Sequence, residues 1–199
     1  MKFKPAAIII AAALSSFAVY AADDTTTGTD VGLITFDGAV TDTTCQITTN
    51  NGVDANNVTI TLPVVKKSDV EATTIDTGVG SKEFELHLSG CPDAITSASA
   101  VFTSTQFAEL SNGTLKADPS VAGAATNVSL ALYNNTSSDS SQIKVGLPDN
   151  NTQVVTIADG AADLAYRVAY VPSYDWNATS NPVTSGKVSS NATFTISYE

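Results

Sequence analysis

The chain has 199 residues, of which 9 are basic and 20 are acidic, and its formal net charge is −11. A strongly acidic surface repels phosphate backbones, so this composition argues against nucleic-acid binding. Two cysteines and a single histidine also leave few side chains for a metal centre or for acid–base catalysis.

Residues 1–21 have the pattern of a secretory signal peptide. Lys2 and Lys4 precede an apolar run from Ala6 to Val19, and small residues follow it. The alternative is a membrane anchor, but the run is shorter than the roughly 20 apolar residues of a spanning helix. Without residues 1–21 the net charge becomes 7 − 20 = −13. We therefore expect export, and a mature chain long enough for one domain.

After residue 22 the sequence predicts a series of short strands. A polar, threonine-rich stretch at 23–30 precedes the β-like stretch Val31–Phe36. Turn residues separate the later segments, which alternate or are rich in β-branched residues. These segments are Val58–Leu62, Phe84–Leu88, Ala100–Thr103, Asn127–Tyr133, Ile143–Val145, Val154–Ile157, Leu164–Tyr170 and 188–198. Ser68–Ala72 is expected to form one helical turn at most. This pattern predicts a single all-β sandwich domain.

The segment 188–198 has the most regular alternation. Its even-numbered positions are apolar except for Ser190, and its odd-numbered positions are polar. A period of two residues predicts a strand with one buried face. The apolar residues of that face are Val188, Ala192, Phe194, Ile196 and Tyr198.

The two cysteines, Cys45 and Cys91, both lie in the exported part of the chain. In an oxidising compartment an isolated pair most simply forms one disulfide. The closed loop of 46 residue steps would stabilise the fold by about 4 kcal/mol in the chain-entropy model. Two free or metal-binding thiols are the competing interpretation.

The sequence contains no motif that indicates catalysis or a metal site. His87 alternates with Leu86 and Leu88, so its ring is expected to point outward. Asp149, Asp159 and Asp163 lie near turn residues, which explains them without calcium ligation, and they lack EF-hand spacing. A sugar site is an alternative for Tyr166, Tyr170, Tyr174 and Trp176, although strand packing and loop positions also explain them. We expect no enzyme, no cofactor and no bound metal.

Four segments form a recognisable set in chain order. Phe36-Asp-Gly38 precedes Cys45, Phe84–Cys91 ends at the second cysteine, and Asn127–Leu132 is a mid-domain strand pattern. The last segment has a glycine fourteenth from its end, Gly186, and a penultimate tyrosine, Tyr198. Together these segments resemble the pilins of the chaperone–usher pathway, in the type 1 fimbrial family.

This resemblance implies an incomplete immunoglobulin-like sandwich that lacks its final strand. Residues 34–199 would form the pilin domain, and residues 22–33 a donor-strand extension. In that family the last strand, here 187–198, borders a hydrophobic groove. A strand from a periplasmic chaperone fills the groove first, and the next subunit's donor strand replaces it. The groove and chaperone-binding residues implied here are Gly186, Val188, Ala192, Phe194, Ile196 and Tyr198.

The implied donor strand lies at about 23–33, and its register is open. One face carries Thr27, Thr29, Val31 and Leu33, and the other carries Thr26, Gly28, Asp30, Gly32 and Ile34. Donor strands of the family place a glycine at one groove pocket, which favours the second face, although Asp30 is poorly suited to an apolar groove. The candidate donor residues are Thr26, Gly28, Asp30, Val31, Gly32 and Leu33.

The function implied by the resemblance is that of a structural, non-enzymatic subunit of a bacterial surface fimbria. It would polymerise by donor-strand exchange and support adhesion. The implied partners are a periplasmic chaperone, an outer-membrane usher and neighbouring pilin subunits, with a tip adhesin as a further candidate. The implied route leads through the periplasm to the cell surface. The alternatives are a secreted, monomeric carbohydrate-binding sandwich and, with less support, an exported hydrolase.

Overall fold

The computed structural model describes residues 44–49 and 58–199. All of them belong to one compact unit, Val40–Glu199. The predicted signal peptide, donor-strand extension and strand Val31–Phe36 lie outside the described residues. Within the described part of the chain, no helix is long and apolar enough to cross a membrane.

The larger of two antiparallel sheets has the strand order β1-β2-β9-β6-β5-β4, and β7 also pairs with β6. Phe84 of β2 lies opposite Tyr166 of β9, and Leu132 of β6 lies opposite Val168 of β9. This register gathers the apolar positions on one face. The strands are β1 (Gln46–Thr49), β2 (Val79–Ser89), β4 (Ala108–Glu109), β5 (Thr114–Lys116), β6 (Val128–Asn134), β7 (Gln142–Ile143) and β9 (Ala162–Pro172).

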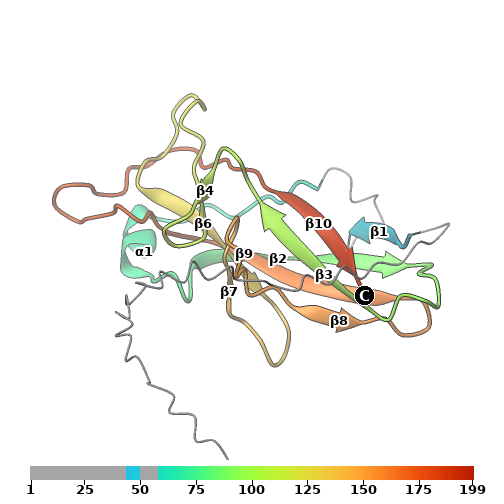
Figure 1. Ribbon diagram of the computed structural model, residues 1–199. Helices are drawn as coiled ribbons and strands as arrows, with labels where there is room; N and C mark the ends of the chain where they lie inside the picture. The colour runs from blue at the N-terminus through green and yellow to red at the C-terminus, as the bar shows by residue number, and fades with distance from the viewer. Residues whose placement is uncertain (1–43, 50–57) are drawn as a thin grey trace, which may run out of the picture. The chain divides into compact units, whose positions relative to one another are not determined.

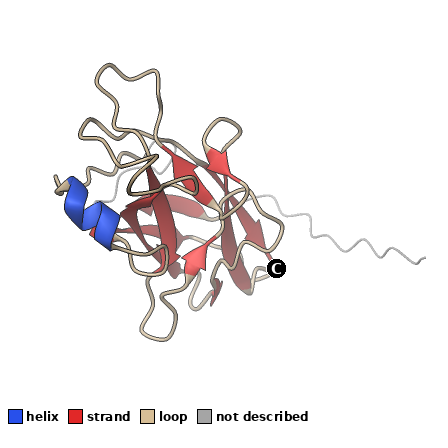
Figure 2. Ribbon diagram, turned by 90° about the vertical axis from the view of Figure 1, so that its left-hand side faces the viewer, coloured by secondary structure: helices blue, strands red, loops and turns tan. Residues whose placement is uncertain are grey.

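The smaller sheet has the order β10-β3-β8. Its strands are β3 (Ser97–Thr103), β8 (Val154–Thr156) and β10 (Thr193–Tyr198). Phe194 of β10 lies directly opposite Phe102 of β3. Figure 1 shows β10 and β3 side by side. Figure 2 shows that strands form nearly all of the regular structure. The predicted all-β sandwich is confirmed.

Apolar side chains from both sheets form the main core. Leu86, Ala100 and Tyr166 are almost completely buried. The ring centroid of Phe102 lies 5.0 Å from that of Tyr166 and 6.4 Å from that of Phe194. The aromatic contacts therefore run from the larger sheet through β3 to β10.

The outer face of the larger sheet carries a second, smaller core. The Tyr133 hydroxyl donates a hydrogen bond of 2.6 Å to the carbonyl of Ile75, in the turn after helix α1 (Lys67–Ala72). The Arg167 guanidinium lies 3.7 Å from the centroid of the Tyr133 ring. At Gly78, which has a φ of +63°, a Cβ would come within 2.5 Å of the Ala169 Cβ. Gly78 thus permits the turn to pack closely on the sheet.

Two predicted strands and the predicted helical turn differ from the structure. Val58–Leu62 keeps its alternating exposure but pairs with no described strand. The segment 188–198 is paired only from Thr193 onward, because β3 ends at Thr103, the residue opposite Thr193. Helix α1 has six residues, so it is longer than the single turn expected.

The hydroxyls of Tyr133 and Tyr166 provide a matched test of this packing. Burial raises the pKa of each phenol to about 12, but the Tyr166 hydroxyl makes no hydrogen bond to the described residues. Thr152, beside it, already donates to the Ala100 carbonyl at 2.6 Å. We expect Tyr133→Phe to lower the free energy of unfolding by about 1 kcal/mol, and Tyr166→Phe to be neutral or slightly stabilising. Urea titrations measure both values, and a larger loss for Tyr166→Phe would contradict this assignment.

Candidate functional site: an apolar groove beside the last strand

A groove with a volume of about 720 Å³ lies between the two sheets, beside β10. A packed core has few voids larger than one water molecule, so a space of this size is not a packing defect of the core. Its lining is mostly aliphatic and aromatic. The lining residues are Cys45, Ile47, Val58, Ile60, Leu62, Phe84, Leu86, Phe102, Leu115, Leu130, Leu132, Val168, Ser190, Asn191, Ala192, Thr193 and Phe194.

The two side walls of the groove come from segments whose backbone is left partly or wholly unpaired by the described residues. On one side β10 is an edge strand, which among the described strands pairs only with β3. On the other side Val58–Leu62 makes no backbone hydrogen bond to another described residue. Such N–H and C=O groups need water or another strand as partners. The groove therefore offers hydrogen-bonding groups along its walls and apolar side chains at its floor.

The polar lining is gathered in one place. Of the residues that line the groove, Ser190, Asn191 and Thr193 carry polar side chains. All three lie in the segment 190–193, which ends at the first residue of β10, and the side chains of Asn191 and Thr193 are exposed. The Ser190 hydroxyl is buried and has no hydrogen-bond partner among the described residues. The groove is thus polar where this segment forms its wall.

The residues predicted from the sequence occupy three different positions. Ala192 and Phe194 line the groove itself. Val188, Ile196 and Tyr198 pack against the main core from the same side, and burial raises the pKa of the Tyr198 phenol. Gly186 does not line the groove but lies against the backbone of residues 123–125. The candidate donor residues at 26–33 lie outside the described residues.

Sequence reasoning missed the wall opposite β10. Val58, Ile60 and Leu62 line the groove although their segment is no paired strand. The signal was present, because these residues alternate with polar ones before Pro63. Alternation indicates which side chains are buried, but not whether the backbone has a partner.

The predicted disulfide between Cys45 and Cys91 is confirmed, with a Cα–Cα distance of 4.2 Å. Cys45 lines the groove and directly precedes β1, while Cys91 follows β2. The disulfide therefore ties Cys45, which is part of the groove lining, to the end of β2.

The remaining reactive side chains do not converge on a site. His87 is exposed, as predicted, and its Nδ1 contacts a carboxylate oxygen of Asp163, directly across the β2–β9 pair. In residues 44–49 and 58–199, no three His, Cys, Asp or Glu side chains are close enough to hold a metal ion. Tyr166 is completely buried and so cannot contact a sugar, whereas the Tyr174 side chain is exposed.

Phe194 tests the role of the β10 wall. We expect Phe194→Asp to lower the free energy of unfolding by roughly 3–5 kcal/mol, because it removes an aromatic contact and places a carboxylate in an apolar wall. Thr195→Asp is the matched control, since the Thr195 side chain lies on the exposed face of the same strand. Chemical denaturation compares the two variants. Equal stability of both variants would refute the inward orientation of Phe194.

The chain is similar to fimbrial proteins over most of its length. Residues 34–199 match the family model described as "Fimbrial protein". The chain is 35% identical to "Major fimbrial subunit SMF-1" of Stenotrophomonas maltophilia, over 84% of this chain and 92% of that protein. It is 31% identical to "Long polar fimbria protein A" of Salmonella typhimurium, over 94% of each. In fold it is similar to the P pilus rod subunit PapA, with a TM-score of 0.56 and 17% identity over 79% of this chain and 100% of that one.

Proposed function

The chain belongs to the fimbrial protein family and is a structural subunit of a bacterial surface fimbria, and we propose that its groove accepts the donor strand of a neighbouring subunit. The observation that carries this proposal is an apolar groove with, on either side, a backbone edge that no other described strand pairs with. An added strand would satisfy those backbone groups and place alternate side chains among the groove's apolar residues. Both requirements are met by an extended peptide with an alternating pattern.

The proposed donor is the N-terminal extension, residues 22–33, and the proposed pilin domain is residues 34–199. Twelve extended residues span about 40 Å, whereas the six residues of β10 span roughly 20 Å. The donor is therefore long enough to follow β10 and the segment before it. The residues proposed to enter or flank the groove are Thr26, Gly28, Asp30, Val31, Gly32 and Leu33.

An unfilled groove explains why a chaperone would be needed before assembly. An exposed strand edge beside a large apolar surface favours aggregation. We propose that a periplasmic chaperone covers β10 first, and that an outer-membrane usher directs the exchange for the neighbour's donor strand. Val188, Ala192, Phe194, Ile196 and Tyr198 would form the side-chain contacts with either strand, and Gly186 would lie at the end of this surface.

The alternative of a monomeric carbohydrate-binding module has less support. Sugar sites combine aromatic surfaces with several polar groups, whereas the floor of this groove is aliphatic and aromatic. The family is one of structural subunits, which supports a non-enzymatic role.

Completion of the fold is tested with a donor strand in cis. Residues 23–34 are fused after Glu199 through a flexible linker, and a fusion with the same residues in scrambled order is the control. Burial of the three or four side chains on one face of this segment is expected to raise the thermal midpoint by about 10 °C. Differential scanning calorimetry of both fusions and of the unfused mature chain measures the shift. A stable unfused monomer that gains nothing from the correct donor would sink the proposal.

The donor assignment is tested by deletion of residues 23–33. Because the groove is unchanged, the shortened chain should still form a complex with the periplasmic chaperone. Without a donor, copies of the shortened chain should form no subunit–subunit link and therefore no fibre. Size-exclusion chromatography of the periplasmic complex and electron microscopy of the assembled product provide the two readouts. Long fibres from the shortened chain would show that another segment is the donor.

A further inference from the structure

Residues 187–189, shortly before β10, are held by main-chain hydrogen bonds to residues 118–125. We call residues 118–125 the supporting loop. Lys187 donates its N–H to the carbonyl of Gly123, and its own carbonyl accepts from the N–H of Ala125, each at 2.8 Å. The carbonyl of Ser189 accepts from the N–H of Asp118 at 2.7 Å. These three bonds place residues 187–189 without any paired strand.

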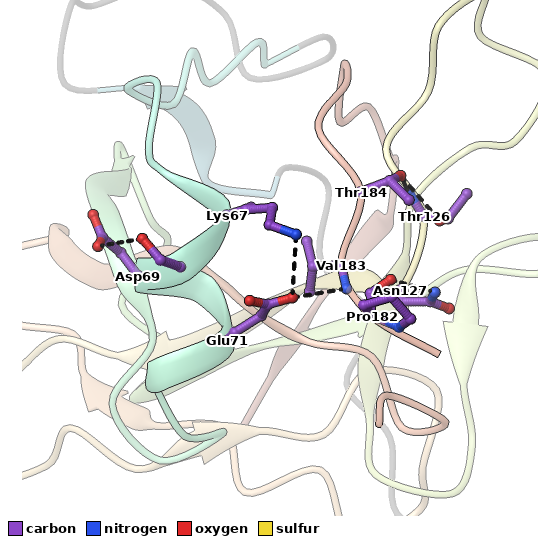
Figure 3. A network of polar contacts seen from close by, with 9 residues as sticks. Lys67, Asp69, Glu71, Thr126, Asn127, Pro182, Val183 and Thr184 are labelled. Carbon is purple, nitrogen blue, oxygen red and sulfur yellow. Dashed lines mark hydrogen bonds and ion pairs between the residues drawn. The ribbon is translucent and has the colours of Figure 1, made fainter. Parts of the chain in front are cut away.

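The residues just before this segment are also fixed, as Figure 3 shows. The Val183 N–H donates to a carboxylate oxygen of Glu71 in α1 at 3.1 Å. The Thr126 N–H donates to the Thr184 hydroxyl at 2.8 Å, and the Asn127 side-chain amide donates to the Pro182 carbonyl at 2.8 Å. The supporting contacts therefore extend from residue 182 to residue 189.

Gly186 lies at the closest approach of the two backbones. A Cβ at this position would come within 2.5 Å of both the Ala125 nitrogen and the Gly123 carbonyl oxygen. Real Cβ atoms do not come this close to other heavy atoms, and neither neighbour is the end of a flexible side chain. The glycine is thus required for space and not for a left-handed φ. Any side chain at 186 would push the segment away from the supporting loop.

The groove wall begins immediately after these contacts. Ser190, Asn191 and Ala192 line the groove, and Ser190 follows directly after the residue whose carbonyl is bonded to Asp118. β3 offers no partner here, because its last residue pairs with Thr193. Within the described chain, the backbone bonds that position residues 190–192 are therefore those of the supporting loop on one side and those of β10 on the other.

We propose that Gly186 is a positioning residue for donor-strand binding: it allows the supporting loop to hold residues 187–189, and so sets where the polar end of the groove lies. This inference rests on the proposed function of the groove. The end of the donor that reaches Ser190 would depend on the contact at Gly186, whereas the rest of the donor would not.

The test measures dissociation of synthetic donor peptides from the mature chain and from its Gly186→Ala variant. The full peptide carries residues 23–34, and two shorter peptides each lack three residues at one end. We expect the full peptide to dissociate about tenfold faster from the variant. The shorter peptide that no longer reaches residues 190–192 should change by less than about twofold. Ser185→Ala is the control, because the Ser185 side chain is exposed on the same turn.

The outcomes separate this inference from the proposed function. If no donor peptide binds the unaltered chain, the proposed function fails. If peptides bind but the substitution changes none of the rates, only the positioning role of Gly186 fails. An equal change in dissociation rate for all three peptides would also overturn it, because a general loss of stability would affect both ends of the groove alike.

Hydrogen exchange of the unaltered chain covers the case in which Gly186→Ala does not fold. The amides of Asp118, Ala125 and Lys187 should exchange at least about tenfold more slowly than unprotected amides, both without and with the donor peptide. The amides of residues 190–192, which precede the first β10 residue paired with β3, should gain protection only when the peptide is added. Fast exchange at Lys187 and Ala125 until the peptide binds would overturn the proposal.

Discussion

A β-strand carries hydrogen-bonding groups on both edges, and in β10 only one edge has a partner among the described strands. The same strand packs Phe194 and Ile196 against a core that continues through Phe102 to Tyr166. β10 is therefore part of the core, and it still has one backbone edge without a partner among the described strands. Addition of one strand would satisfy its backbone and cover the groove with the same contact. Under the proposed donor-strand binding, assembly of the subunit into a fibre depends on this open edge of β10.

Binding of an extended segment costs conformational entropy, which a pre-formed groove reduces. Several contacts fix the groove before any partner arrives. The disulfide ties Cys45 to the end of β2, and the supporting loop holds residues 187–189. β1, next to the disulfide, pairs with the last four residues of β2. Helix α1 precedes the first residue of β2. β1 and α1 therefore lie toward opposite ends of β2 (Figure 1). Only the incoming strand then has to become ordered.

The sequence predicted the long strands well because their buried faces alternate. Phe84, Leu130 and Val168 all lie on inward faces that a period of two residues revealed. The same signal predicted strands at Val58–Leu62 and at 188–198, but among the described residues Val58–Leu62 and the segment 188–192 belong to no paired strand. Alternation follows burial, and both segments are half-buried along the groove wall. Pairing depends on which strand lies alongside, and no local pattern contains that information. β1, β4 and β5 are too short for alternation to identify them.

The groove side chains also explain why fold and binding are hard to separate by mutation. Phe84, Phe102 and Phe194 line the groove, and the rings of Phe84 and Phe102 pack on Tyr166 in the core. Truncation of any of them removes core contacts and donor contacts together. Gly186 differs, because it contributes no side chain to either surface and acts through the position of its backbone. In this chain the need for glycine at 186 therefore follows from the space that the supporting loop occupies and not from the groove itself.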